Sequence, residues 1–121
     1  MSQYVDGFVI PLKKDRIEKY RNIASQAGAI WKEHGALAYF EAVGDDLDNP
    51  MFPMRFPQIA ACADDETVIF AWIVYASREH RDEVNAKVMA DPRIHAIMDP
   101  NDPVMDCARM AYGGFRVIVE A

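Results

Sequence analysis

The chain has 121 residues, of which 51% are apolar and 26% are charged. This balance is typical of one globular domain spanning residues 1–121, and it excludes disordered and collagen-like chains. Nineteen acidic residues against thirteen basic ones give a net charge of −6. Nucleic-acid-binding surfaces need clustered positive charge, so the composition argues against DNA or RNA as a partner.

The sequence also predicts a compartment. Its longest unbroken apolar run, Val68 to Ala76, is much shorter than the ~20 residues that a membrane helix needs. Cys62 and Cys107 are too few for a disulfide framework, and the N-terminus does not have the charge order of a secretory signal. We therefore expect a cytoplasmic protein with reduced thiols and no membrane contact.

The N-terminal third of the chain predicts a strand, a helix and a second strand. Tyr4–Leu12 is rich in aromatic and β-branched residues, which favour a strand. In Asp15–His34 the apolar residues recur at steps of three and four, which predicts an amphipathic helix. Asp15 and Glu18 have the spacing of a capping box at its start. Ala36–Val43 predicts the second strand.

The middle of the chain predicts two more strands and a helix. Gln58–Cys62 fits a short edge strand. Thr67–Ala76 is apolar on both faces, which indicates a central strand. Ser77 is a suitable N-cap for a helix over Arg78–Ala90, and Ile94–Met98 fits one further helical turn.

The last strand is predicted over Phe115–Glu120, after a turn at Gly113–Gly114. The element order β-α-β-β-α-β predicts an α+β, ferredoxin-like fold, a four-stranded antiparallel sheet with both helices on one face. The helices leave the other face of an apolar central strand uncovered. We therefore expect a second copy of the chain to cover it, which gives a homodimer.

Stretches throughout the chain carry a resemblance to one family: YVDGFVIP (Tyr4–Pro11), AGAIWKEHGAL (Ala27–Leu37), DDETVIFAWIVYASRE (Asp64–Glu79), VNAKVMADPR (Val84–Arg93) and RMAYGGF (Arg109–Phe115). Together they resemble the YbaA-like family of small, uncharacterised bacterial proteins. The resemblance implies a dimeric α+β barrel, in which two ferredoxin-like chains pack sheet to sheet. That family has no established activity, so the resemblance implies no catalytic residue.

Motifs for metals and cofactors are missing from the sequence. His34, His80 and His95 are the three histidines, and none has the spacing of a metal-ligand pair. No phosphate loop, dinucleotide fingerprint or hydrolase nucleophile motif occurs. We therefore predict no metal and no cofactor. His34 remains open between a catalytic role and a charge that complements the C-terminus of the first helix.

Polar residues on strands that should be covered are the strongest site candidates. Asp6 and Glu41 share strand faces with aromatic residues, and a desolvated carboxylate becomes a proton acceptor near pH 7. Tyr39 and Trp72 would shape an apolar pocket for a small molecule. The alternative is that Asp6, Glu41 and Arg116 form cross-strand ion pairs or lie at a solvated rim.

One segment between the predicted strands allows two interpretations. Leu47–Pro57 is rich in both proline and large apolar residues. It is either a lid over the pocket, with Arg55 facing an anionic ligand, or a clasp packed on the partner subunit. Arg78, Arg81 and Arg93 are interleaved with acidic residues, which predicts a solvated helix face.

Several functions fit these patterns. The first is a homodimer with a small-molecule pocket, resembling cofactor-free dimeric α+β barrel enzymes, whose candidate catalytic residues are Asp6, Glu41 and His34, and whose candidate ligand-binding residues are Tyr39, Trp72 and Arg55. The second is a non-enzymatic ligand-binding or interaction protein. RNA binding is the weakest of the hypotheses because of the acidic charge. Titration of an interior carboxylate near neutral pH distinguishes an enzyme from a binder.

Overall fold

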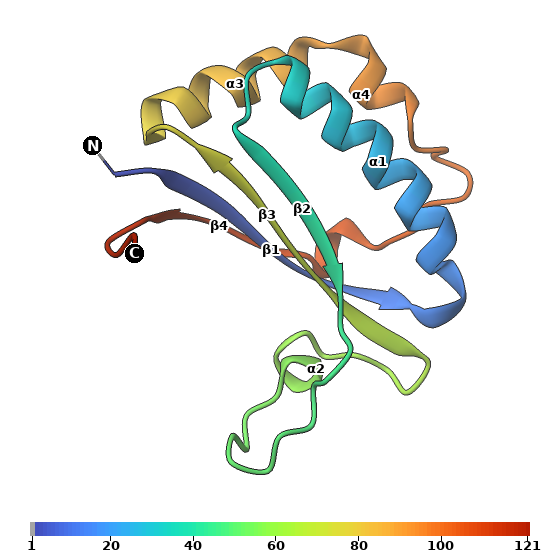
Figure 1. Cartoon of the computed structure of the whole chain (residues 1–121). Helices are drawn as coiled ribbons and strands as arrows, with labels where there is room; N and C mark the ends of the chain where they lie inside the picture. Colours follow the sequence, from blue (N-terminus) through green and yellow to red (C-terminus); the bar gives the residue numbers. More distant parts are fainter. Residues whose placement is uncertain (1) are drawn as a thin grey trace.

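The computed structural model describes residues 2–121, and its strands form one antiparallel sheet in the order β2-β3-β1-β4 (Figure 1). The strands are β1 (Tyr4–Lys13), β2 (Ala38–Val43), β3 (Glu66–Tyr75) and β4 (Ala111–Arg116). The predicted α+β class and the four-stranded antiparallel sheet are confirmed. β3 is hydrogen-bonded to β1 on one side and to β2 on the other, so it is a central strand, as its apolar sequence predicts.

Three helices lie on the same face of this sheet: α1 (Ile17–Glu33), α3 (Arg78–Ala90) and α4 (Pro92–Ala96) (Figure 1). The core between them and the sheet is apolar, and its most buried side chains include Leu12, Tyr75, Val84 and Val88. The predicted N-cap of α3 is confirmed, because the Ser77 hydroxyl accepts a hydrogen bond of 3.1 Å from the backbone N–H of His80.

The predicted capping box at the start of the first helix is wrong. A 3₁₀ turn, η1 (Lys14–Arg16), joins β1 directly to α1, and Asp15 lies inside that turn. The N-cap of α1 is therefore Arg16, which makes no side-chain capping bond. The predicted helix end is correct, because Gly35 adopts a φ of 115°, a conformation that favours glycine.

Two predicted strands differ from the structure. Gln58–Cys62 is not an edge strand, because α2 (Phe56–Ile59) forms there, with Pro57 in the first helical turn where its missing N–H costs nothing. The last strand, β4, runs over Ala111–Arg116 rather than the predicted Phe115–Glu120, so Gly113–Gly114 lies inside it rather than in a turn, and residues 117–120 lie outside it. The reason is close packing, because a Cβ on Gly114 would lie 2.9 Å from Cζ of Tyr4.

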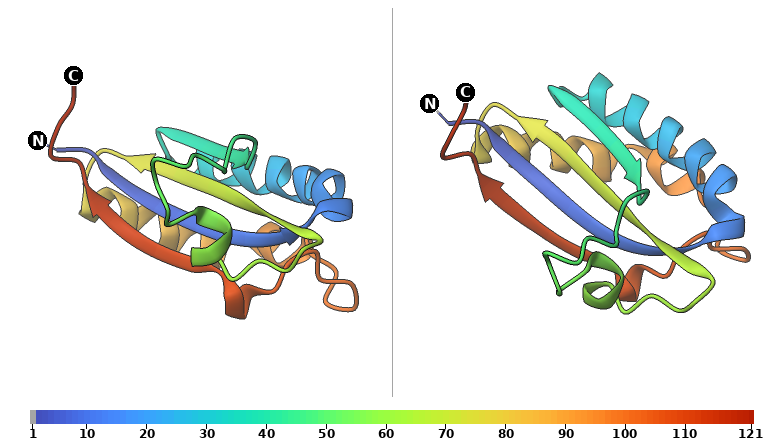
Figure 2. Two further views of the ribbon diagram at one scale, coloured as in Figure 1. Left: turned by 90° about the horizontal axis from the view of Figure 1, so that it is seen from below. Right: turned by 60° about the horizontal axis from the view of Figure 1, so that its bottom comes forward.

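The second face of the sheet is apolar over three consecutive rows of paired residues. Three rows run across the four strands in register: Ala38, Val74, Val5 and Phe115; Phe40, Trp72, Gly7 and Gly113; Ala42, Phe70, Val9 and Ala111. The three helices α1, α3 and α4 all lie on the opposite face (Figure 2). Phe40 and Phe115 are consequently 50% and 61% exposed within one chain.

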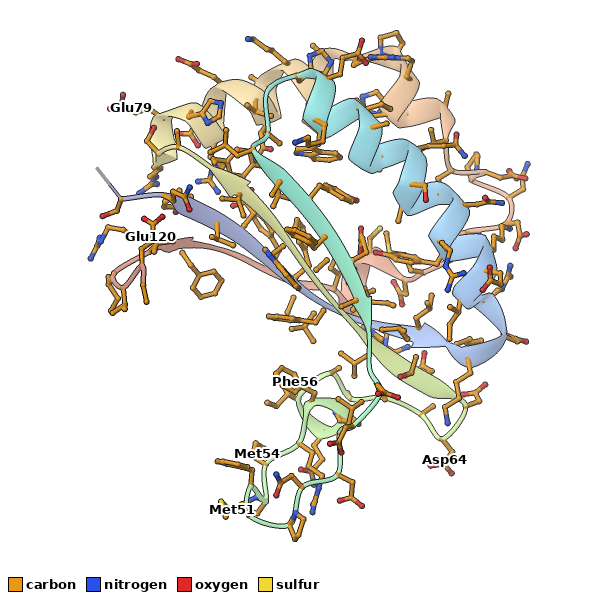
Figure 3. All side chains as sticks on the ribbon, in the orientation of Figure 1. Met51, Met54, Phe56, Asp64, Glu79 and Glu120 are labelled. Carbon is orange, nitrogen blue, oxygen red and sulfur yellow. The ribbon has the colours of Figure 1, made fainter. Side chains whose placement is uncertain are left out.

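The segment between β2 and β3 extends away from the helical layer (Figure 1). Met51 and Met54 lie toward its far end, distant from α1 and α3 (Figure 3). Phe56 packs this segment against the apolar sheet face, because the centroid of its ring lies 6.0 Å from the centroid of the Phe70 ring. Within residues 2–121, no helix is long and apolar enough to cross a membrane.

Candidate functional site

Glu41 is clamped by two tyrosines between α1 and the edge strand β2. Its neighbour at the second position along the strand, Tyr39, points to the same face and donates a hydrogen bond of 2.6 Å to Oε2. Tyr20, on the inner stripe of α1, donates one of 2.6 Å to Oε1. Both oxygens of one carboxylate are thus held by short phenolic hydrogen bonds.

The two phenols stay protonated over the physiological range. Burial raises the pKa of Tyr20 and of Tyr39 far above the ordinary value of 10, and the neighbouring charge of Glu41 raises each pKa further. Each phenol therefore acts as a hydrogen-bond donor to Glu41, and the site keeps a fixed arrangement of polar groups.

Two cavities adjoin this cluster. The outer cavity, of about 480 Å³, runs along α1 beside β2 and includes the polar side chains of Arg21, Ser25 and Lys32. The inner cavity, of about 220 Å³, lies between the sheet and the helices. The two linings share four residues: Tyr20, Ala24, Tyr39 and Glu41. The Glu41 cluster therefore stands where the outer cavity meets the inner one.

The inner cavity is apolar apart from this cluster. Glu41 is the one charged residue in its lining. Three methionines of the chain that follows α4 form part of its wall, together with isoleucines of α1 and α4: Met98, Met105, Met110, Ile23 and Ile94. Methionine side chains are flexible and polarizable, so this wall can adapt to the shape of a bound molecule.

Asp6 is buried, as its position on β1 predicts, and its partner is a helix residue. Its carboxylate is 1% exposed and accepts a hydrogen bond of 2.7 Å from Nη1 of Arg81. The Arg81 side chain is only 12% exposed, so the prediction that it lies on a solvated helix face is wrong. The ion pair joins α3 to β1 and is not the cross-strand pair considered from the sequence.

A polar network extends from this ion pair into the core. Asn85, one turn after Arg81 on α3, donates to Asp6 Oδ2 at 3.4 Å. Its own Oδ1 accepts hydrogen bonds from Trp31 Nε1 at 3.2 Å and from the Tyr75 hydroxyl at 3.1 Å. Every polar group named here has a partner, which is what burial requires. The network connects α1, α3 and the sheet, and its chemistry is that of a structural support.

The remaining candidates lie apart from the Glu41 cluster. His34 caps α1, and its Nε2 is 2.8 Å from Oδ2 of Asp91, the N-cap of α4. Trp72 lies on the apolar sheet face, stacked on Phe40 with centroids 5.0 Å apart. Arg55 lies in the segment before α2, where its Nε is 2.8 Å from Oδ1 of Asp48.

The structure thus brings together Glu41 and Tyr39 and keeps Asp6, His34, Trp72 and Arg55 elsewhere. Arg116 lies at the end of edge strand β4 with its side chain exposed. None of these five residues lines the outer or the inner cavity.

Metal-binding clusters are not found in the described part of the chain. Among residues 2–121, no three His, Cys, Asp or Glu side chains are grouped so that they could hold an ion. Cys62 and Cys107 are both free thiols. The polar chemistry where the two cavities meet is therefore that of one carboxylate and two phenols, and Arg21, Ser25 and Lys32 add polar groups to the outer cavity alone.

Tyr20 is the site residue that the sequence pattern missed. It lies on the apolar stripe of α1, a pattern that by itself indicates a core residue. A buried tyrosine hydroxyl needs a hydrogen-bond partner, and this requirement is the signal that could have linked Tyr20 to a carboxylate on the facing strand. The methionines of the inner wall carry no recognisable periodic pattern, because Met98, Met105 and Met110 all lie outside the helices and strands.

Comparison with known families gives a match over most of the chain. A family model described as "Protein of unknown function (DUF1428)" matches residues 3–107. The uncharacterized protein YbaA of Escherichia coli K12 is 36% identical over 118 residues, which cover 98% of both chains. The uncharacterized protein YbaA of Shigella flexneri matches to the same extent.

Solved structures provide a comparison of the fold. A crystal structure of a NIPSNAP family protein of unknown function from Agrobacterium tumefaciens has a TM-score of 0.57 and 19% identity. The match covers 95% of this chain and 87% of that one. A second crystal structure of the same Agrobacterium tumefaciens protein gives a TM-score of 0.55, also at 19% identity, over 93% and 90% of the two chains. At this identity the likeness concerns the fold alone.

Proposed function

The chain belongs to the DUF1428 family of proteins of unknown function, and from the geometry of this member we propose that it binds a small molecule in the two cavities around Glu41. The observation that carries the proposal is the position of that carboxylate. It lies at the junction of an outer cavity of about 480 Å³ and an apolar inner cavity of about 220 Å³. Ligand pockets have this composition, with apolar walls and a few oriented polar groups.

The way Glu41 is held supports this role. An ionised carboxylate offers about four acceptor positions, and the two phenols use one on each oxygen. The remaining positions are available to a bound molecule. Because Tyr20 and Tyr39 fix the carboxylate on both sides, it is oriented before a ligand arrives, which lowers the entropic cost of binding.

Any cofactor-free acid–base reaction would use the same carboxylate. Glu41 can reach a molecule in either cavity, whereas Asp6 is already engaged by Arg81 and Asn85. On this proposal Glu41 is the group placed to accept a proton, and Asp6 holds the fold together. A Glu41→Gln variant that retains every activity found for the wild-type protein would contradict the catalytic part of the proposal.

The binding proposal is tested by native mass spectrometry of the protein purified from its own host. Ala24 lines both cavities, so an Ala24→Leu variant fills the space that they share. Ala86→Leu, on an exposed position of α3, is the matched control. We expect a small molecule that is retained by the wild type and the control and lost from Ala24→Leu. A molecule retained equally by all three proteins, or none in the wild type, would contradict the proposal.

The fold supports a second proposal, which concerns assembly. The strand order β2-β3-β1-β4 with its helices on one face is consistent with a ferredoxin-like topology. We propose that two such chains pack sheet to sheet as a dimeric α+β barrel. The support is the open sheet face, where three rows of residues carry no polar side chain. A face of this kind is typical of an interface between subunits.

The open face also has the self-complementary shape that a two-fold interface needs, with one protruding half and one recessed half. Its central row is aromatic on one half, at Phe40 and Trp72, and lacks side chains on the other half, at Gly7 and Gly113. The glycine half forms an apolar trough of about 450 Å³. In a two-fold pair, the aromatic half of each chain can enter the trough of the other, since an isologous interface must be self-complementary.

The segment Leu47–Pro57 fits the clasp in this assembly better than the lid. Its large apolar side chains are exposed in one chain, with Met51 at 78% and Met54 at 69%. It stands on the side of the open sheet face, and none of its residues lines the cavities at Glu41. Sedimentation equilibrium tests the assembly, for which we expect twice the chain mass of 13.7 kDa. A monomer at micromolar concentration would contradict it.

The two free cysteines fit the cytoplasm as the compartment.

A further inference from the structure

The three polar groups at the junction of the two cavities, Tyr20, Tyr39 and Glu41, can all act only as hydrogen-bond acceptors toward a bound molecule. Each phenol has one hydrogen, and that hydrogen is used on Glu41. What Tyr20 and Tyr39 still offer is oxygen lone pairs. Glu41, an ionised carboxylate, offers only lone pairs as well. A molecule bound here therefore meets three acceptors and no free donor within this cluster.

From this arrangement we infer that the site selects neutral molecules with an apolar body and a hydroxyl-type hydrogen-bond donor, and that it rejects carboxylic acids. The inference rests on the proposed binding function and names its ligand class. The donor would bind to Glu41, and the body would occupy the inner cavity between α1, α4 and the sheet.

The charge of the site argues against an anionic ligand. Glu41 is the one charged group in the lining of the inner cavity. A ligand carboxylate placed beside it would meet a like charge in surroundings where water cannot screen the repulsion. In the inner cavity it would also lose its hydration without gaining a donor, which is costly for an ionised group, because Arg21 and Lys32 line only the outer cavity.

The outer cavity argues against a cationic ligand. Arg21 and Lys32 both line it, so an ammonium group would have to pass two positive charges to reach Glu41. An ammonium group in the apolar inner cavity would also have to give up most of its hydration. A neutral hydroxyl avoids both costs and still provides the donor that the cluster lacks.

The shape of the inner cavity indicates the body of the ligand. Its wall includes Met98, Met105 and Met110, which come from the same irregular stretch and can change rotamer independently of the helices. A wall of this kind tolerates an alkyl chain or a ring, so selection comes from the polar end of the ligand. The inference therefore concerns the head group and leaves the body free to vary.

A matched set of eight-carbon probes tests the inference by isothermal titration calorimetry on the wild-type protein. 2-Octanol has a donor, 2-octanone has the same skeleton without one, octanoate is an anion, and 2-aminooctane is a cation. A hydrogen bond to a charged acceptor strengthens binding by about tenfold or more. We expect 2-octanol to bind about tenfold more tightly than 2-octanone and more tightly still than octanoate.

The outcomes separate this inference from the proposed function. If none of the four probes binds, the proposed binding function is wrong. If 2-octanone or octanoate binds as well as 2-octanol, a ligand binds but the inferred class is wrong. If 2-aminooctane binds more tightly than 2-octanol, the restriction to neutral molecules is wrong.

A variant and a second readout connect the preference to Glu41. In Glu41→Gln we expect the ratio of 2-octanol to 2-octanone affinity to fall toward one and octanoate to bind more tightly, whereas Glu83→Gln on the exposed side of α3 changes neither. Should Glu41→Gln fail to fold, methionine methyl NMR on the wild type decides. We expect 2-octanol to shift the methyl signals of Met98, Met105 and Met110. Shifts confined to Met51 and Met54 would overturn the inference.

Discussion

Gly28 of α1 lies against the ring of Tyr39 of β2, so closely that a Cβ on Gly28 would be 2.8 Å from Cδ1 of the ring. A glycine in the middle of a helix normally costs about 1 kcal/mol relative to alanine. Here the missing side chain lets the helix approach the edge strand. The contact allows Tyr39 to lie under the helix with its hydroxyl on Glu41.

We therefore predict that Gly28→Ala destabilises the protein although alanine favours the helix. The overlap with the ring must displace Tyr39 or α1, and overpacking of this kind costs about 1–3 kcal/mol. The measurement is urea unfolding, combined with 2-octanol titration, in which the affinity should fall. A Gly28→Ala protein that gains about 1 kcal/mol, as helix propensity alone would give, contradicts the account of this contact.

The buried ion pair gives a second prediction. Arg81→Met removes the cationic partner of Asp6, which is 1% exposed, and leaves a buried carboxylate with no positive charge paired to it. Breaking a buried pair from one side typically costs 3–5 kcal/mol. We expect a loss of about that size in the free energy of unfolding.

A double variant shows whether the loss comes from the unpaired charge. In Asp6→Asn with Arg81→Met no charge is left at this place, so the double variant should be more stable than Arg81→Met alone. Equal or lower stability of the double variant would mean that packing of the arginine stem, rather than charge, accounts for the effect. The 2-octanol affinity should change little, because Asp6 and Arg81 line neither cavity.

The pair of Glu66 and Arg109 predicts a dependence of stability on pH. Hydrogen bonds from Arg109, together with one from the backbone N–H of Ala63, lower the pKa of Glu66 from 4.5 to about 2. A carboxyl group whose pKa is lower in the folded state stabilises the fold above the unfolded pKa. This stabilisation is fully present above pH 4.5 and is lost as the pH falls toward about 2.

Urea unfolding of the wild type and of Glu66→Gln between pH 7 and pH 2 measures this contribution. The difference between their free energies of unfolding should be constant above pH 4.5 and should shrink below it. At low pH the protonated carboxyl group of the wild type is neutral, as the glutamine amide of the variant is at every pH. Glu83→Gln, on an exposed position of α3, is the matched control. A Glu66→Gln difference that does not change with pH contradicts the assigned pKa.

The proposed dimer gives a prediction at Gly113. A Cβ there would lie 3.6 Å from the Phe115 ring, an ordinary contact, so one chain can accommodate a methyl group at this position. Gly113→Leu would fill the trough that is proposed to receive the aromatic half of the partner. We expect a weaker dimer in sedimentation, with little change in the far-UV circular dichroism.

Gly113→Ala is the graded control for this experiment, and we expect it to remain a dimer. If Gly113→Leu sediments as the wild type does, the trough is not part of an interface. A variant that loses its circular dichroism at the same time would point instead to β4, in which Gly113 pairs with Gly7.

Periodicity and composition predicted the elements that are both long and regular. Thr67–Ala76 corresponds to β3 and Arg78–Ala90 to α3, because an apolar run and a capped amphipathic pattern each carry their own signal. The prediction failed where tertiary packing decides. Gly113–Gly114 has the composition of a turn, yet both residues are in a strand since the Tyr4 ring needs the space above Gly114.

The site shows the same division. Glu41 and Tyr39 are two positions apart on one strand, so the sequence alone could place them on the same face. Their third partner, Tyr20, lies on a helix, and Arg81 is 75 positions from Asp6. Contacts over such distances depend on how helices lie on the sheet. Local patterns therefore predicted that Asp6 and Glu41 need partners without identifying those partners.

A crystal structure of the protein grown with 2-octanol would test the central claim most directly. The account predicts the hydroxyl within hydrogen-bonding distance of Glu41 and the alkyl chain among Met98, Met105 and Met110. Electron density for the alcohol on the open sheet face beside Trp72, with the inner cavity closed by side chains, would contradict it.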